Sequence, residues 1–479
     1  MTSLPIQAQH YIGGEWLGEP SVPRDDPANT TDVVAVSPAG DEADIDAAID
    51  AAETAQIEWA NLPAPARGEV LRLAANHIAA DRYSIAEDMT REEGKLLGEA
   101  LGEVQRTIDV LNFFAGEGQR SRGDLLAGSN SDTELRVTRH PVGVAGLITP
   151  WNFPMAIPAW KAAPALVAGN TVVLKPAALT PMSANHLARA FAAAGAAPGV
   201  FNVVHGDGPS PGHALAADAR VGAVSFTGST EVGWKVHETV SGRRGRVQLE
   251  MGGKNATVVR PTADLDDAAR AIAQSSFGLT GQACTATSRV ICPANMMGDL
   301  LDLLVDHARA ISPGPGLDPT SSMGPVVSPA QARRVRGAIS AAVADGAEVA
   351  CGGSEDDGTC FVSPTVLTGV NPSSTAAQVE IFGPVVALLR ADQLGEAIEL
   401  ADNVRYGLVA SIFTRQIDEA LEFSRRVQTG VIKVNRPTTG LDLNVPFGGV
   451  KDSSSATYRE QGTTATDFFT WTKTTYLGW

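Results

Sequence analysis

Between Pro141 and Glu250 the sequence alternates between short apolar runs and amphipathic segments, and this pattern constrains the fold more than any other feature. The short runs predict strands that are covered on both faces, and the segments between them have helical periodicity. The expected strands are residues 142–148, 171–175, 199–204, 223–228 and 247–250, and the expected helices are residues 155–169, 182–195 and 230–240. Strands that alternate with helices predict a parallel, doubly wound α/β sheet.

A second α/β block follows from about Met251. Its expected strands are residues 288–292, 385–390, 410–414 and 430–435, and its expected helices are residues 297–311 and 418–427. Before the first block, a short hairpin at residues 11–16 precedes a part that reads as mostly helical. Two further segments, 131–140 and 467–479, alternate like exposed antiparallel strands, so we expect them to pair with each other or with another subunit.

The chain has 479 residues, which is too long for one hydrophobic core and predicts two or three domains. Its 37 Lys and Arg residues face 54 Asp and Glu residues, and the net charge of −17 argues against binding to nucleic acid or to an anionic membrane. The uncharged run 142–160 contains Pro150, Pro154 and Pro158, which a membrane-spanning helix would tolerate poorly. It therefore reads as a buried strand, a loop and the start of a helix.

The four cysteines, Cys284, Cys292, Cys351 and Cys360, form no CxxC pair and no metal-ligand spacing, so we expect no metal site. Four cysteines in so long a chain do not make a disulfide framework, and the first residues lack the basic start and apolar core of a signal peptide. Both observations predict a cytoplasmic protein. The sequence assigns no role to Cys292, Cys351 or Cys360.

Cys284 lies in the stretch GLTGQACTATSR, among small and hydroxyl-bearing residues rather than aliphatic ones. Two interpretations are open: the thiol fills space as a small hydrophobe, or it is a nucleophile. A nucleophile needs a base and donors for an oxyanion. Glu250 in LEMGGKN is a candidate base and Asn152 in PWNFP is a candidate donor, although each is also compatible with a merely structural role.

Several turns after strands have features of a nucleotide site. The segment HGDGPSPG contains Gly208, but its last glycine comes one residue late for a GxGxxG motif, and a plain loop fits as well. Gly228 ends a strand before an expected helix whose first amide groups favour an anion, with a structural turn as the alternative. Lys175 ends another strand, where it reaches a ribose or phosphate unless it is simply solvated. Glu380 and Phe382 pair a carboxylate with a ring, which suits a sugar and an aromatic cofactor, although a glutamate here is also compatible with a loop cap.

Seven motifs occur in the order in which the aldehyde dehydrogenase superfamily carries them: PWNFP, VVLKPA, FTGSTEVG, LEMGGKN, GQACTATSR, EIFGPV and PFGGVKDS. The chain resembles that superfamily over essentially its whole length. The resemblance implies two doubly wound parallel-sheet α/β domains plus a small antiparallel oligomerisation arm. The implied boundaries are residues 1–118 and 142–252 for a dinucleotide-binding domain, 253–451 for a catalytic domain, and 119–141 with 452–479 for the arm.

The resemblance also implies the chemistry. Cys284 attacks the aldehyde carbon, and the oxyanion of the thiohemiacetal accepts hydrogen bonds from the Asn152 side chain and the Cys284 backbone. Hydride transfer leaves a thioester, which water activated by Glu250 hydrolyses to the carboxylic acid. Relatives that pass the acyl group to coenzyme A are expected to lack this base. The implied catalytic set is Cys284, Glu250, Asn152 and Lys175, and Lys175 and Glu380 hold the ribose hydroxyls. The implied cofactor-binding residues are Thr149, Pro150, Trp151, Lys175, Ala178, Gly208, Gly228, Ser229, Val232, Glu250, Glu380 and Phe382.

Ala178 bears on the choice between NADP and NAD. In NAD-preferring relatives a glutamate often stands three residues after the position of Lys175, where it repels a 2′-phosphate. That repulsion is absent from this chain, so we predict that NADP is accepted and preferred. A small residue at this place is also compatible with the use of both cofactors.

The segments WNFPMAIPAWKAAPAL and NRPTTGLDLNVPFGGVKDSSS are most similar to those of 2,5-dioxovalerate (α-ketoglutaric semialdehyde) dehydrogenases. One departure counts against a carboxylated substrate. Succinic semialdehyde dehydrogenases usually carry arginines where this chain has Gly278 and Trp160. A distal carboxylate therefore needs another partner, such as Arg289 or the hydroxyls of Thr285 and Ser455.

Other functions stay open at this point. Trp160 and Phe277 could equally line a pocket for a neutral or aromatic aldehyde, and a broad-specificity, succinic semialdehyde or aromatic aldehyde dehydrogenase is the nearest alternative. A catalytically idle structural relative is disfavoured because all four catalytic candidates are present. The expected partner is a small-molecule aldehyde, and the arm predicts a homodimer or a homotetramer, between which the sequence does not choose.

Overall fold

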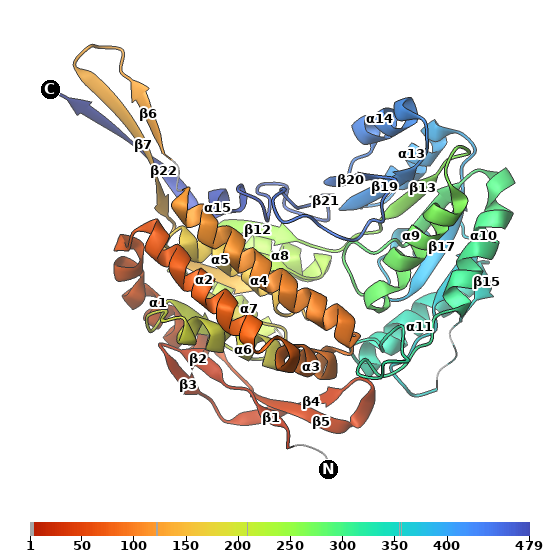
Figure 1. Cartoon of the computed structure of the whole chain (residues 1–479), viewed down its shortest axis with the longest axis horizontal. Coiled ribbons are helices and arrows are strands. Elements are labelled where there is room, and N and C mark those ends of the chain that lie inside the picture. Colours follow the sequence, from red (N-terminus) through yellow and green to blue (C-terminus); the bar gives the residue numbers. More distant parts are fainter. Residues whose placement is uncertain (1–3, 121–122, 208, 354, 356) are drawn as a thin grey trace.

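The computed structural model describes residues 4–120, 123–207, 209–353, 355 and 357–479 of the chain. Figure 1 shows two α/β bodies side by side and a narrow arm that projects from the first of them. The sheets of the two bodies are mainly parallel. The fold class expected from the sequence is therefore confirmed.

The first sheet has seven strands, in the order β12 (Arg246–Glu250), β11 (Val221–Thr227), β8 (Val144–Ile148), β9 (Thr171–Lys175), β10 (Phe201–Val203), β2 (His10–Ile12) and β3 (Glu15–Leu17). The five strands from β12 to β10 are parallel, and the β2–β3 hairpin is added antiparallel to β10. The expected strands and hairpin are found. The carboxyl ends of the parallel strands therefore meet at one edge, where Lys175 and Glu250 end β9 and β12.

Both faces of this sheet are buried, which explains why its strands are apolar throughout. Val172 and Leu174 join one core and Val173 joins another, because successive strand residues point to opposite faces. The first core is completed by α2 (Ala64–Ala80), α3 (Arg82–Glu93), α4 (Leu97–Gln119), α5 (Ala156–Val167) and α6 (Pro181–Ala193). The second is completed by α1 (Glu42–Asn61), α7 (Pro209–Ala217) and α8 (Thr230–Gly242).

The second sheet also has seven strands, in the order β15 (Glu348–Cys351), β16 (Thr365–Thr368), β17 (Val385–Arg390), β14 (Arg289–Cys292), β13 (Ala256–Val259), β19 (Val409–Phe413) and β20 (Val431–Val434). Only the pairing of β15 with β16 is antiparallel in this sheet. Helices α9 (Leu265–Phe277) and α10 (Ala294–Arg309) cover one face, and α11 (Pro329–Ala344), α13 (Leu394–Asp402) and α14 (Ile417–Arg426) cover the other. Short elements complete this part: η1 (Gly278–Gly281), α12 (Thr375–Gln378), β18 (Tyr406–Gly407) and β21 (Val450–Lys451).

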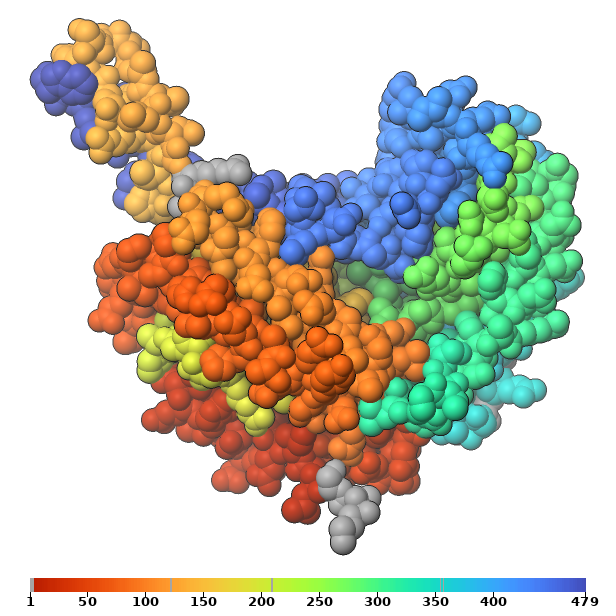
Figure 2. Space-filling model, viewed as in Figure 1, coloured from red at the N-terminus to blue at the C-terminus, as the bar shows by residue number. Residues whose placement is uncertain are grey.

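The arm is a three-stranded antiparallel sheet in the order β22 (Thr470–Gly478), β7 (Thr133–Pro141) and β6 (Asp124–Ala127), and α15 (Ala465–Phe468) leads into it. Strands β7 and β22 pair along their full lengths, so the two ribbons expected from the sequence pair within the chain. Figure 2 shows the arm standing clear of the body, and the exposed side chains on it include Leu125, Tyr476 and Trp479. The residue boundaries expected for the domains and the arm remain a prediction.

One sheet near the N-terminus was not expected. Strands β1 (Ile6–Gln7), β5 (Asn29–Pro38) and β4 (Pro20–Asp26) form it in that order, within a part of the chain that the sequence indicated as mostly helical. Its strands carry exposed polar residues and prolines, and three register shifts interrupt the pairing of β4 with β5, so no clean alternation marks them.

The uncharged run 142–160 forms strand β8, an irregular loop and the first part of α5, as expected. Among the described residues, no helix combines the length and the apolar character that crossing a membrane requires.

Candidate active site

Residues from both bodies line a cavity of about 140 Å³. Eight of them were expected in the site from the sequence: Pro150, Trp151, Asn152, Gly228, Ser229, Cys284, Glu380 and Phe382. Six others complete the lining: Ile157, Thr227, Met251, Gly252, Gln331 and Arg334. Cys284 therefore lines the same cavity as residues that were expected to bind the dinucleotide.

Cys284 is held by its backbone in a loop that follows a tight turn. Leu279 and Thr280 have φ angles of 52° and 55°, and Gly281 has a φ of 67°, so three successive residues adopt left-handed backbone. A Cβ atom on Gly281 would lie 2.2 Å from the Gly383 carbonyl oxygen, so only glycine fits there. The Asn255 side-chain amide donates to the Cys284 carbonyl (2.8 Å) and fixes the residue from the other side.

The thiol of Cys284 is half-buried and unbridged. Burial raises its pKa to about 12, and the nearby carboxylates Glu380, Glu250 and Glu460 act in the same direction. The thiol is therefore protonated at neutral pH in this form of the protein. An attack on a carbonyl carbon requires that this proton leaves.

Asn152 lies in the loop between β8 and α5 and is 4% exposed. Its Nδ2 donates to the carbonyl of Gln282 (2.9 Å), two residues before Cys284 in the same loop. An amide nitrogen carries two hydrogens, so one remains for a second acceptor. The position fits a donor for an oxyanion that forms at the carbon bonded to Cys284.

Glu250 ends β12 and is buried. Its carboxylate accepts hydrogen bonds from the Gly449 amide (3.2 Å) and the Ser454 hydroxyl (3.1 Å). Burial raises the pKa of Glu250 well above its ordinary value, and the carboxylate of Glu460 adds to the shift. A carboxylate with a raised proton affinity suits a general base for water.

Glu460 was not expected from the sequence. It forms a buried ion pair with Lys161 and accepts a hydrogen bond from the Trp160 indole (2.8 Å). The ring of Trp160 lies 6.3 Å from that of Phe447, which belongs to an apolar cluster that also contacts Cys284. Phe447 therefore has Trp160 as a ring neighbour, and the indole N–H of Trp160 is directed to Glu460. In the sequence, Glu460 follows Tyr458 and Arg459, and nothing there distinguishes it from a charged residue on the surface.

The cofactor-side residues lie on the first sheet and on the loops around it. Lys175 is buried at the end of β9, where burial lowers its pKa and Asp207 opposes that shift. Ala178 follows in the next loop and is partly exposed. Ser229 occupies the N-cap position of α8 without a side-chain hydrogen bond to the helix, and Val232 is exposed in the first turn. Gly208 lies outside the described residues.

Glu380 and Phe382 come from the second body. The Glu380 carboxylate accepts a hydrogen bond from the Gly253 amide (3.0 Å), and burial raises its pKa to about 7. Phe382 has a φ of 57° and meets Trp151 edge to face, with ring centroids 5.3 Å apart. A carboxylate and two rings from opposite walls thus face one cavity.

The chemistry of these groups fits a dinucleotide. The buried hydroxyls of Thr149 and Thr227 have no hydrogen-bond partner among the described residues, so they have donors and acceptors to offer. The first amides of α8 face the same edge of the sheet, and no side chain caps them. An anion is stabilised at such a helix N-terminus, while a carboxylate such as Glu380 suits sugar hydroxyls.

Two of the expected substrate contacts, Arg289 and Phe277, are not among the residues that line the cavity of Cys284. Arg289 is 1% exposed, and its guanidinium donates to the carbonyls of Lys254 (3.0 Å), Leu400 (2.8 Å) and Ala401 (2.7 Å), so it supports the backbone of the second body. Phe277 packs into the core between α9, α10 and the second sheet. A large side chain that is close to Cys284 in sequence can therefore point away from the cavity that Cys284 lines.

The two hydroxyl candidates have different surroundings. Thr285 is buried next to Cys284. Ser455 accepts a hydrogen bond from the Leu249 amide (3.2 Å) and contacts the Thr457 hydroxyl, so it belongs to the support of β12. Asn255, which holds the Cys284 loop, was missed, although it ends the LEMGGKN motif.

The model of the aldehyde dehydrogenase family matches residues 16–475. The chain belongs to this family. Among curated relatives, the α-ketoglutarate semialdehyde dehydrogenase of Haloferax volcanii is 45% identical (98% of each chain covered) and the α-ketoglutaric semialdehyde dehydrogenase of Bacillus subtilis is 40% identical (98% of this chain and 97% of the relative). The 2,5-dioxopentanoate dehydrogenase of Saccharolobus solfataricus is 41% identical over 439 residues, covering 91% of this chain and 92% of the relative.

Solved structures agree with this assignment. An NADP-dependent enzyme of Escherichia coli superposes with a TM-score of 0.95 at 34% identity (99% of this chain and 98% of that chain). An NAD-dependent aldehyde dehydrogenase of Sinorhizobium meliloti gives a TM-score of 0.96 at 32% identity (98% and 95%). The family expected from the seven motifs is confirmed, and the protein is an aldehyde dehydrogenase that uses a nicotinamide cofactor.

Proposed function

We propose that this enzyme oxidises 2,5-dioxovalerate (α-ketoglutaric semialdehyde) to the corresponding dicarboxylic acid. The substrate class is supported by the names of the three similar enzymes of Haloferax, Bacillus and Saccharolobus. The observation that carries the chemistry is that Cys284 opens into the same cavity as Asn152, Glu380 and Phe382, with Glu250 buried close by.

In the first step the sulfur of Cys284 attacks the aldehyde carbon, and the thiol proton leaves to solvent. The carbonyl oxygen becomes an oxyanion. Asn152 Nδ2 donates a hydrogen bond to it with the hydrogen that Gln282 does not use. The Asn255 amide, bonded to the Cys284 carbonyl, keeps the backbone NH of the loop oriented for the same purpose.

The bound dinucleotide supplies the hydride acceptor, and the product on the protein is a thioester at Cys284. Glu250 removes a proton from water, which attacks that thioester and releases the acid. The hydrogen bonds from Gly449 and Ser454 hold the Glu250 carboxylate in place. Because its pKa is raised, this step is expected to become faster as the pH rises.

The preferred cofactor is proposed to be NADP. Lys175 would bind its phosphate or ribose, Ser229 and the first turn of α8 would receive the pyrophosphate, and Glu380 would bind a ribose. No side chain at Ala178 repels a 2′-phosphate. Thr149, Pro150, Trp151 and Val232 would line the dinucleotide, and no metal is required.

Assembly through the arm is part of the proposal. Its exposed apolar side chains and the unpaired edge of β6 suit contacts with a second copy, so a homodimer or homotetramer is expected. The four cysteines are all unpaired, as a reducing, cytoplasmic compartment would keep them.

A panel of aldehydes tests the function. Steady-state oxidation of 2,5-dioxovalerate, succinic semialdehyde, benzaldehyde and propanal is measured with NADP and with NAD. The proposal expects the highest kcat/KM for 2,5-dioxovalerate with NADP. A higher kcat/KM for benzaldehyde or propanal would contradict the substrate, and no turnover of any aldehyde would contradict the activity.

A further inference from the structure

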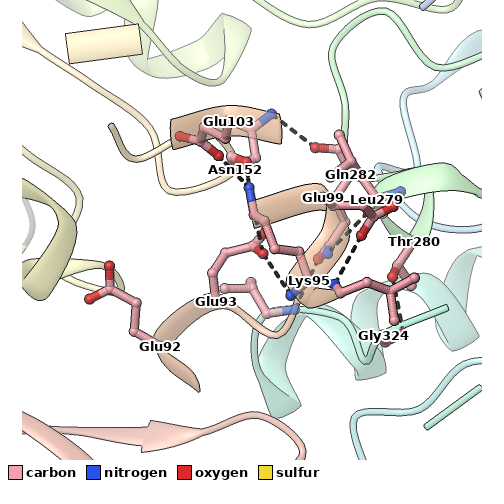
Figure 3. A network of polar contacts seen from close by, with 12 residues as sticks. Glu92, Glu93, Lys95, Glu99, Glu103, Asn152, Leu279, Thr280, Gln282 and Gly324 are labelled. Carbon is pink, nitrogen blue, oxygen red and sulfur yellow. Dashed lines mark hydrogen bonds and ion pairs between the residues drawn. The ribbon is translucent and has the colours of Figure 1, made fainter. Parts of the chain in front are cut away.

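A fully buried ion pair lies directly behind Asn152, at the start of α4. Lys95, in the link between α3 and α4, is 2% exposed, and its Nζ lies 2.6 Å from Glu103 Oε2 and 3.8 Å from Glu93 Oε2. The same Nζ donates to the backbone carbonyl of Asn152 (2.8 Å) and lies 5.0 Å from the ring centre of Phe153. Figure 3 shows the Lys95 side chain running toward Asn152 and Glu103.

Glu103 holds the other end of the Asn152 loop. Its Oε1 accepts hydrogen bonds from the amides of Met155 (2.9 Å) and Ala156 (3.1 Å), where α5 begins. A carboxylate at a helix N-terminus satisfies amides that have no partner in the helix. Lys95 and Glu103 therefore hold the backbone at both ends of the four-residue segment from Asn152 to Met155.

The chain turns sharply so that Lys95 can point inward. Gly94 has a φ of 98°, and a Cβ atom on it would lie 2.8 Å from Pro27 and 2.9 Å from Pro325. Glycine is the residue that accepts both the left-handed backbone and the close packing. The position of Lys95 is thus built into the end of α3.

The first turn of α4 also reaches the loop of Cys284. Glu99 Oε1 accepts from the Leu279 amide (2.7 Å), the first residue of the left-handed turn that leads to Cys284, and Glu99 Oε2 accepts from the Leu96 amide (3.0 Å). The loop of the oxyanion donor and the loop of the nucleophile are therefore fixed to one rigid element (Figure 3).

We propose that Lys95, with Glu103 as its counter-charge, is a positioning residue that sets where the Asn152 amide meets the oxyanion. A buried ion pair gives little stability compared with an apolar pair of the same volume, so stability alone does not account for it. The ammonium contacts the main chain of Asn152 rather than a remote part of the core. This inference rests on the proposed role of Asn152.

A double-mutant cycle tests the proposal. Lys95→Met, Asn152→Ala and the combination are compared by kcat/KM for propanal. Lys95→Met is expected to lose about a hundredfold, the size expected for a displaced catalytic group. In the Asn152→Ala background the same change is expected to alter kcat/KM within about twofold, because the donor it positions is gone. The Kd for NADP is expected to stay unchanged.

Controls keep the result interpretable. Arg260→Met breaks another ion pair of low exposure, with Glu419 (3.0 Å), in the second body and is expected to leave kcat unchanged. If Lys95→Met does not fold, Lys95→Met/Glu103→Gln replaces it in the cycle, since glutamine still accepts from Met155 and Ala156 and removes one of the two buried carboxylates that Lys95 faces. If the fold-losses in kcat/KM of Lys95→Met and Asn152→Ala multiplied in the combined variant, the two residues would act independently. This result would overturn the assignment of Lys95. A wild-type kcat/KM in Asn152→Ala would contradict the proposed function itself.

A second observation concerns the distal carboxylate, for which Arg289 is not available. A cavity of about 610 Å³ has Lys433, Arg436, Asp442, Leu441 and Phe447 among its lining residues. Leu441 and Phe447 belong to, or pack against, the apolar cluster that contacts Cys284. This cavity and Cys284 therefore contact the same apolar cluster.

The two cations of this cavity are not equivalent. Lys433 Nζ donates to the carbonyls of Thr439 (3.1 Å) and Gly440, so it is committed to the loop after β20. The Arg436 guanidinium is exposed and makes no hydrogen bond or ion pair with the described part of the chain. We infer that Arg436 binds the distal carboxylate of the substrate. This inference rests on the proposed substrate class.

Matched substrates test this site. Arg436→Met is compared with Arg425→Met, an exposed arginine on α14, using 2,5-dioxovalerate and pentanal. Arg436→Met is expected to raise KM for 2,5-dioxovalerate by about 10- to 100-fold, as the loss of a charge-assisted hydrogen bond would, and to leave KM for pentanal unchanged. Equal changes for both aldehydes, or none, would overturn the assignment. A wild-type enzyme that prefers pentanal would contradict the proposed substrate instead.

Discussion

Two buried lysine–glutamate pairs lie beside candidate catalytic residues, and they differ in what they contact. Lys161 and Glu460 lie beside Glu250, and Lys95 and Glu103 lie beside Asn152. All four side chains are 1–2% exposed. Glu250 titrates, so the charge of Glu460 changes its proton affinity; Asn152 does not titrate, so its pair can act only through geometry. The Lys161–Glu460 pair therefore acts on the proton affinity of Glu250, whereas the Lys95–Glu103 pair acts on the position of Asn152.

The largest expected effect comes from removing the sulfur atom of Cys284, the reacting atom that both pairs are proposed to support. Cys284→Ala is expected to lower kcat by at least about a thousandfold, because removing a nucleophile leaves only the binding contributions. Cofactor binding, measured by calorimetry with NADP, is expected to be unchanged. If this variant still oxidised aldehydes at a wild-type rate, neither pair would flank the reacting group.

Glu250→Gln separates the two steps that the pairs support. The steady-state rate is expected to fall by about 10²- to 10⁴-fold, the range for the loss of a general base. One burst of NADPH per active site is expected to remain, because attack by Cys284 does not need water to be activated. A burst of wild-type size followed by a wild-type steady rate would place the base elsewhere.

The pH dependence of kcat distinguishes the pairs directly. Burial and the carboxylate of Glu460 raise the pKa of Glu250, so the rate of hydrolysis rises with pH as Glu250 loses its proton. Glu460→Gln removes a negative charge, which lowers that pKa and moves the rising limb of the profile to lower pH. Glu103→Gln is expected to lower kcat without moving the limb. If the rising limb of the pH profile shifted equally in Glu460→Gln and Glu103→Gln, the two lysine–glutamate pairs would not differ in the way described.

Ala178→Glu gives the smallest expected effect and lies outside both pairs. A carboxylate there repels a 2′-phosphate, so the ratio of kcat/KM for NADP to that for NAD is expected to fall by about tenfold, which corresponds to about 1.4 kcal/mol. The pH limb and the burst are expected to stay as in the wild type. An unchanged ratio would refute this explanation of cofactor choice.

The parts that could be predicted from sequence are those with a local signature. The order of strands and helices followed from apolar runs such as residues 171–175, and the family followed from seven ordered motifs. Cys284 and Asn152 stand within such motifs, and the structure places both on one cavity.

What could not be predicted depends on burial. Lys95 and Glu460 are charged residues in polar stretches, and nothing local shows that the chain folds over them. The sequence suggested that Arg289 could bind a carboxylate, but its guanidinium donates hydrogen bonds to three backbone carbonyls. Charged side chains are rarely fully buried, so a prediction from the sequence alone places them at the surface.

The most direct test of the covalent mechanism is the mass of the protein after one turnover. Glu250→Gln is mixed rapidly with NADP and 2,5-dioxovalerate, quenched in acid and digested, and the peptide that carries Cys284 is weighed. The expected result is one acyl group on Cys284, formed in step with the burst of NADPH. An unmodified Cys284 after a full burst, or an acyl group on another residue, would contradict it.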